Sequence, residues 1–167
     1  MGLNETPSSK RIRISFFGRR NAGKSSLVNA LTNQNLSVVS ATPGTTTDPV
    51  SKSMELGNLG PVVITDTAGI DDVGELGNLR VEKTLEIINK TDIAVLVVDS
   101  LEGESEFDKE LKKLFENKKL SYIIVYNKCD DCDVNTDVLC VSAKTGRNIE
   151  KLKEKIISYI FFPTCFG

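Results

Sequence analysis

Short apolar runs alternate with segments of helical periodicity along most of the chain. A run without polar alternation is typical of a strand that is buried on both faces of a sheet. Such strands are expected at Ile12–Phe17, Val62–Thr65, Ile93–Asp99, Tyr122–Tyr126 and Val138–Val141. Apolar residues at helical spacing predict helices over Lys24–Leu31, Arg80–Asn89, Phe107–Asn117 and Ile149–Ile160.

This alternation predicts an α/β domain with a mostly parallel six-stranded sheet and helices on both faces. The segment Val50–Leu56 alternates more weakly and is expected to form an antiparallel edge strand. Residues 1–10 are polar and are expected to be a flexible N-terminal segment, with one domain over 11–160 and an apolar tail over 161–167. The polar loop 33–48 is long, and loops of this length are often functional.

Composition narrows the class of protein. The 167 residues suit one domain with a single core, and 40% hydrophobic with 26% charged residues is ordinary for a globular protein. No apolar run is long enough to span a membrane, and the N-terminus lacks the apolar core of a signal peptide, so a cytoplasmic location is expected. The net charge of −2 indicates no basic surface, so neither a nucleic acid nor a membrane is expected as a partner.

The counts of histidine and cysteine exclude some chemistry. The chain has no histidine, which rules out a triad or a general base built on that residue. Of its four cysteines, Cys129 and Cys132 form a single C-x-x-C pair, whereas structural zinc usually needs four Cys or His ligands. Reduced cysteines are therefore expected, with a metal or redox site as the alternative.

The segment from Gly18 to Ser25 fits the phosphate-binding pattern G-x-x-x-x-G-K-[ST], with an expected strand before it and a helix after it. Glycine lets the backbone curve around phosphate oxygens, so that N–H groups at a helix N-terminus face the anion. Lys24 is expected to reach the β- and γ-phosphates, and the Ser25 hydroxyl to bind Mg²⁺. The residues predicted to contact phosphate are Asn21, Ala22, Gly23, Lys24, Ser25 and Ser26.

A second motif, Asp66-Thr67-Ala68-Gly69, closes the apolar run Val62–Thr65. An aspartate at such a strand end can hold Mg²⁺ through water, and the Gly69 N–H can face a γ-phosphate. On its own this pattern is weak, but its distance from the phosphate-binding loop makes it specific.

Two further motifs select the base. Asn127-Lys128-Cys129-Asp130 ends a predicted strand, and the Asp130 carboxylate can accept hydrogen bonds from N1–H and the 2-amino group of guanine. Adenine lacks this pair of donors, so it would leave the carboxylate unpaired. The segment Ser142-Ala143-Lys144 is expected to offer a backbone N–H to guanine O6. The sequence therefore predicts GTP and GDP as ligands.

In their order and spacing, these motifs resemble a Ras-like P-loop GTPase domain from Ile12 to about Tyr159, and most closely its TrmE–Era–EngA branch. The segment Gly44-Thr45-Thr46-Thr47-Asp48 is similar to the G-T-T-R-D motif of that branch, with a threonine in place of the arginine. The resemblance implies slow, Mg²⁺-dependent hydrolysis of GTP to GDP and phosphate as a conformational switch. It makes Thr46 a Mg²⁺ ligand, unless a shift of one residue places Thr45 there.

The same resemblance implies that Asn21 holds K⁺ against the phosphates, although an asparagine also suits a turn for its own sake. Ile70 stands where Ras-like enzymes carry a glutamine that orients water, and isoleucine cannot do this. Glu75 lies nearest to the catalytic glutamate of TrmE-like enzymes; the alternative is that the acids of this loop only interact with solvent. The residues expected to act in catalysis are Lys24, Thr46, Gly69 and Glu75.

Segments 44–56 and 71–84 are also similar to HydF, the family of GTPase scaffolds in [FeFe]-hydrogenase maturation. In that family a dimerisation domain and an iron–sulfur domain follow, so the resemblance implies an isolated GTPase domain without a cluster, whose full protein works with hydrogenase maturation partners. The first alternative is a tRNA-modification or ribosome-assembly GTPase of the same branch. The second is a non-catalytic module that forms a homodimer when GTP is bound.

Overall fold

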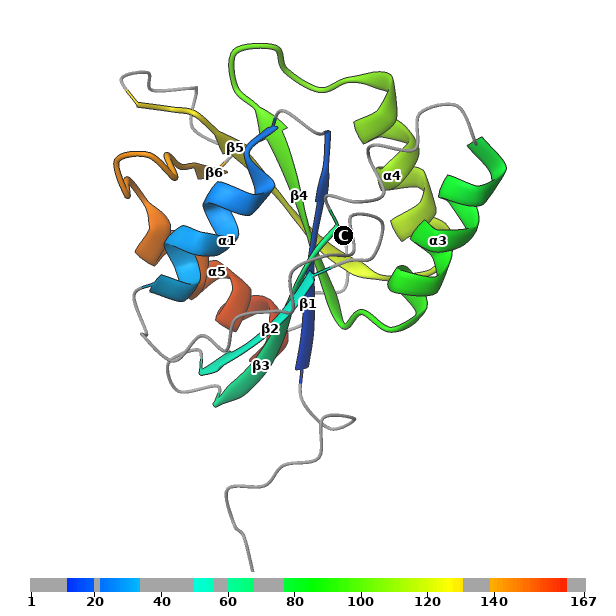
Figure 1. The fold of residues 1–167 in the computed structure, drawn as a ribbon, viewed down its shortest axis with the longest axis horizontal. Helices are drawn as coiled ribbons and strands as arrows, with labels where there is room; N and C mark the ends of the chain where they lie inside the picture. The colour runs from blue at the N-terminus through cyan, green and yellow to red at the C-terminus, as the bar shows by residue number, and fades with distance from the viewer. Residues whose placement is uncertain are drawn as a thin grey trace, which may run out of the picture.

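The computed structural model describes residues 12–19, 22–33, 50–55, 60–67, 77–130 and 139–161. Within these residues, six strands form one sheet in the order β2-β3-β1-β4-β5-β6 (Figure 1). β2 runs antiparallel to β3, and the other pairings are parallel. The elements are β1 (Ile12–Gly18), α1 (Lys24–Asn33), β2 (Val50–Glu55), β3 (Pro61–Asp66), α3 (Gly77–Asn89), β4 (Ile93–Asp99), α4 (Glu106–Asn117), β5 (Ser121–Asn127), β6 (Leu139–Cys140) and α5 (Ile149–Phe161).

Helices cover both faces of the sheet, with α1 and α5 on one face and α3 and α4 on the other (Figure 1). β4 is buried at every position, so its alternate side chains enter two separate cores. Val95 and Val97 pack with α1 and α5, whereas Leu96 and Val98 pack with α4. In the second core, the rings of Phe17 and Phe115 meet edge to face with centroids 5.0 Å apart.

The sequence predicted this α/β fold and its mainly parallel sheet, and the boundaries differ from the expected ones by only a few residues. α4 begins at Glu106 because Ser105 caps it. The Ser105 Oγ accepts a hydrogen bond from Asp108 N at 3.2 Å, and the Asp108 carboxylate accepts one from Ser105 N at 2.9 Å. The expected N-terminal segment and most of the expected tail lie outside the described residues.

The carboxyl ends of the parallel strands lie along one edge of the sheet, where ligands of α/β proteins bind. The strand register aligns the motif residues there. Phe16 lies opposite Asp66, Gly18 opposite Val97, and Asp99 opposite Asn127. The sheet therefore places the phosphate-binding, aspartate and base motifs beside one another.

Candidate nucleotide-binding site

Two glycines shape the loop between β1 and α1. Gly18 has a φ of +143°, and a Cβ there would lie 2.3 Å from the carbonyl oxygen of Val97. Gly23 has a φ of +88°, and a Cβ there would lie 2.4 Å from the Nδ2 atom of Asn127. Both positions therefore need glycine, because the backbone is left-handed and a neighbouring strand or side chain fills the space.

Lys24 is the first residue of α1 and is only 2% exposed. Its Nζ donates hydrogen bonds to the carbonyl oxygens of Gly18 and, at 3.2 Å, of Arg19. A buried ammonium group needs such partners because desolvation of an unpaired charge is costly. The loop itself thus fixes the lysine charge at the N-terminus of α1, where the helix already favours anions.

Ser25 and Asp66 meet although they are 41 positions apart in the chain. The Ser25 Oγ donates a hydrogen bond to the Asp66 Oδ2 at 2.5 Å, which joins the start of α1 to the end of β3. The end of β3 is tied to β1 in turn, since the Thr67 hydroxyl donates to the Phe16 carbonyl at 2.6 Å. A hydroxyl and a carboxylate side by side are hard oxygen ligands of the type that Mg²⁺ prefers, so the residues present fit this ion.

Asn127 connects the two ends of the candidate site. It is 2% exposed, its Nδ2 donates to the Ala22 carbonyl at 2.9 Å, and its Oδ1 accepts from the Ala143 N–H at 3.1 Å. One amide therefore joins the phosphate-binding loop, the end of β5 and the segment after β6. The sequence predicts that segment 142–144 offers a backbone N–H to guanine O6. One N–H of this segment, that of Ala143, already donates to Asn127 within the protein.

Asp130 is exposed, and the Ser142 hydroxyl holds its carboxylate. The Ser142 Oγ is fully buried, donates to the Asp130 Oδ1, and accepts a hydrogen bond from Thr145 N at 3.1 Å. The serine thus fixes one oxygen of the carboxylate that was predicted to read guanine. The sequence predicts only a backbone N–H from segment 142–144, so this side-chain contact of Ser142 is new in the structure.

A cavity of about 520 Å³ opens at this edge of the sheet, within the usual range of ligand pockets. Most of its lining comes from the phosphate and base motifs, and one residue, Leu101, comes from neither. The lining residues are Gly23, Ser26, Leu101, Asn127, Lys128, Asp130, Ser142, Ala143 and Lys144.

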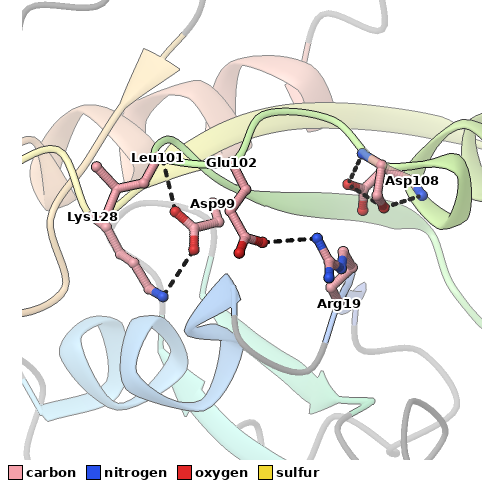
Figure 2. A network of polar contacts seen from close by, with 7 residues as sticks. Arg19, Asp99, Leu101, Glu102, Asp108 and Lys128 are labelled. Atoms are coloured by element: carbon pink, nitrogen blue, oxygen red, sulfur yellow. Dashed lines mark hydrogen bonds and ion pairs between the residues drawn. The ribbon is translucent and has the colours of Figure 1, made fainter.

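Asp99 is a part of the site that the sequence analysis missed. It ends β4, and its carboxylate accepts from Lys128 Nζ at 3.0 Å and from Leu101 N at 2.8 Å (Figure 2). Burial alone would raise the pKa of this carboxyl. The hydrogen bonds from Lys128 and from the N–H groups of Leu101 and Glu102, together with the positive charge of Lys128, leave the pKa below its usual 3.8. A strand-ending aspartate after an apolar run, as at Asp66, is the signal that could have found it.

Several residues with predicted roles lie outside the described part of the chain. These residues are Asn21, Thr46, Gly69 and Glu75, and the structure does not test their predicted roles.

Of the cysteines in the C-x-x-C pair, Cys129 is fully buried, with its Sγ 3.6 Å from the Tyr126 carbonyl. Cys132 lies outside the described residues. In the part of the chain that the structure describes, no three His, Cys, Asp or Glu residues gather as metal ligands. Nor does a helix there have the length and apolarity to cross a membrane.

Comparison with known proteins adds the family. The profile of a family described as 50S ribosome-binding GTPase matches residues 13–128. GTPase Der from Nautilia profundicola is 38% identical over 169 residues, which cover 87% of this chain and 36% of that protein. GTPase Der from Campylobacter concisus is 40% identical over 140 residues, covering 81% of this chain and 30% of its own length. The chain thus spans about a third of the length of these relatives.

Solved structures show the same fold. Era from Aquifex aeolicus, bound to GDP and AlF₄⁻, superposes with a TM-score of 0.69 at 26% identity, over 88% of this chain and 56% of that one. Era in complex with MgGDPNP and a segment of 16S ribosomal RNA gives 0.70 at 26% identity, over 90% and 57% of the two chains. The α/β architecture is therefore that of P-loop GTPases.

Proposed function

The chain belongs to the family of 50S ribosome-binding GTPases, and we propose that it is a GTP-hydrolysing switch that acts in ribosome assembly. The family description supports a role at the ribosome. The relatives at 36–40% identity are named as GTPases and support the hydrolysis of GTP. Era, one of the similar structures, was solved with ribosomal RNA, which is a fact about that protein. The sequence-based expectation that no nucleic acid takes part therefore has no support.

The hypothesis of a HydF-type GTPase domain has no support from the comparisons. The relatives reported above include no hydrogenase-maturation protein. That hypothesis depends on segments 44–56 and 71–84, of which residues 44–49, 56 and 71–76 lie outside the described residues. We therefore prefer the hypothesis of a ribosome-assembly GTPase, which the sequence analysis gives as an alternative.

The observation that carries the nucleotide chemistry is the cavity in which Asp130 and the phosphate-binding loop meet. Asp130, fixed by Ser142, would accept hydrogen bonds from guanine, and Lys24 would face the β- and γ-phosphates. Ser25 and Asp66 would hold Mg²⁺, which neutralises charge on the phosphates. Thr46 would be a further Mg²⁺ ligand when GTP is bound, the Gly69 N–H would face the γ-phosphate, and Glu75 would orient the attacking water.

The test of guanine recognition is an Asp130→Asn variant. An amide in place of the carboxylate can no longer accept both guanine donors, but it can donate to the 2-oxo group of xanthine. We expect at least tenfold weaker GDP binding and a gain in affinity for xanthosine diphosphate, measured by calorimetry. The matched control is Glu150→Gln, the same change at an exposed position of α5. Unaltered preference in Asp130→Asn would remove this residue from base recognition.

We also propose that K⁺ stimulates hydrolysis through Asn21, which stands in the phosphate-binding pattern. A monovalent cation there would offset charge that develops between the β- and γ-phosphates. Turnover should be faster in KCl than in NaCl at equal ionic strength, and Asn21→Ala should remove the difference while GDP affinity is largely kept. Equal rates of the unmodified protein in the two salts would exclude the K⁺ role.

The proposed role in ribosome assembly has a separate test. Sedimentation of the protein with purified 50S subunits should be greater with a non-hydrolysable GTP analogue than with GDP, because a switch binds its target in one nucleotide state. If the protein binds guanine nucleotide but sediments with the subunit in neither state, ribosome assembly is wrong and the nucleotide chemistry stands.

A further inference from the structure

Leu101 combines two features. It is the one large hydrophobic side chain that is exposed among the described residues, with 77% of its surface accessible. The same side chain lines the cavity that contains Asp130 and Lys128. Exposed apolar surface at a pocket is typical of a position that a ligand covers, since ligand pockets are lined largely by apolar groups around a few polar ones.

The turn that carries Leu101 is held in place from within. Besides the 2.8 Å bond from Leu101 N to Asp99 Oδ1, the N–H groups of Glu102 and Gly103 donate to the Asp99 carbonyl at 3.2 and 2.8 Å. Glu102 also reaches Arg19 of the phosphate-binding loop at 2.8 Å (Figure 2). Leu101 is therefore exposed on an ordered turn.

Asp99 ties this turn to the base motif. One oxygen of its carboxylate accepts from Leu101 N and the other from the Lys128 ammonium group, as Figure 2 shows. A single buried side chain thus sets where both residues stand at the cavity wall. Lys128 has a φ of +66°, so its own backbone is also held in a conformation that lysine rarely adopts.

We propose that Leu101 is a nucleotide-contact residue whose side chain covers the nucleoside part of a bound guanine nucleotide, and that Asp99 is the positioning residue that orients it together with Lys128. The nucleoside is the part concerned because Leu101 shares its cavity with Asp130 and Ala143 of the base motifs. This inference rests on the proposed function, since it takes guanine nucleotide as the occupant of the cavity.

The experiment compares fluorescent GDP binding to the unmodified protein and to Leu101→Ala. Loss of a covered isobutyl group should weaken binding about fivefold to tenfold. Displacement of the fluorescent GDP by inorganic pyrophosphate should give the same inhibition constant for both proteins, because pyrophosphate has no nucleoside. Leu101→Met, which keeps an apolar side chain of similar volume, should recover most of the affinity.

Two controls separate the possible failures. Lys113→Ala, an exposed change on α4, should bind GDP as the unmodified protein does, and thermal unfolding checks that each variant is folded. If the unmodified protein binds no GDP, the proposed function fails. If it binds GDP and Leu101→Ala binds equally well, or loses pyrophosphate affinity to the same extent, the contact is wrong.

The positioning role of Asp99 is tested by a double-mutant cycle for GDP affinity. Asp99→Asn should weaken GDP binding, and the loss in the Asp99→Asn, Leu101→Ala double variant should be smaller than the product of the single losses, because both changes remove the same contact. A merely structural effect of Asp99 would leave the two losses multiplicative, and that result would overturn the role.

Discussion

The side-chain amide of Asn127 lies 2.9 Å from the carbonyl oxygen of Ala22, 105 positions earlier in the chain. This contact brings the end of β5 against the phosphate-binding loop, and it leaves room only for a hydrogen atom at Gly23. The base-reading and phosphate-binding parts of the site are thus fitted to each other by direct packing. A substitution in the phosphate-binding loop should therefore also disturb the part of the site that binds the base.

Gly23→Ala should therefore impair both binding and folding. Its methyl group would lie 2.4 Å from Asn127 Nδ2, at a φ that alanine rarely adopts. We expect at least tenfold weaker GDP binding and a loss of about 1–3 kcal/mol in the free energy of unfolding. The matched control is Gly60→Ala, where φ is +85° but nothing lies within 4 Å. It should lose stability and keep its GDP affinity; equal effects of both changes on binding would contradict the packing argument.

Ser25→Ala tests the fit of Mg²⁺ to the pair formed with Asp66. Without the hydroxyl, GTP affinity in Mg²⁺ should fall on the order of tenfold or more, toward the value measured after removal of the metal with a chelator. With the chelator present, the variant and the unmodified protein should bind GTP alike. A variant that keeps the full gain from Mg²⁺ would show that Ser25 is not a ligand.

Asp99 should contribute a pH-dependent part of the stability. Its pKa in the folded state lies below 3.8, so the stabilisation is present above the ordinary pKa and is lost as the pH falls through the folded value. Asp99→Asn should thus be less stable than the unmodified protein by about 1 kcal/mol at pH 7, with the difference shrinking below about pH 4. Urea unfolding at several pH values measures it. A difference that stays constant down to pH 3 would mean that the charge of Asp99 is not what stabilises the fold.

The strands and the phosphate-binding loop could be predicted because each depends on local sequence. β4 is apolar from Ile93 to Val98, and a short run of this kind, rich in valine, favours a strand that is buried on both faces. The glycines at 18 and 23 mark the loop. The helix starts were less certain, since α4 begins where Ser105 caps it, one residue before the first apolar position.

The contacts of Asp99 and Ser142 could not be predicted because they depend on strand register. Asp99 reaches Lys128 only because β4 and β5 pair with Asp99 opposite Asn127. Ser142 reaches Asp130 across twelve positions of the chain, which no periodicity reveals. The exposure of Leu101 likewise follows from the turn that Asp99 fixes, and a leucine in a short polar segment carries no such signal by itself.

The central claim, a guanine-specific phosphohydrolase built on the phosphate-binding loop, is tested most directly by phosphate release from GTP and from ATP in Mg²⁺ and K⁺. The unmodified protein should release phosphate from GTP above the spontaneous rate and not from ATP. Lys24→Ala should abolish the activity, because it removes the ammonium group that the carbonyl oxygens of Gly18 and Arg19 hold in the loop. Equal release from ATP, or full activity in Lys24→Ala, would contradict the account.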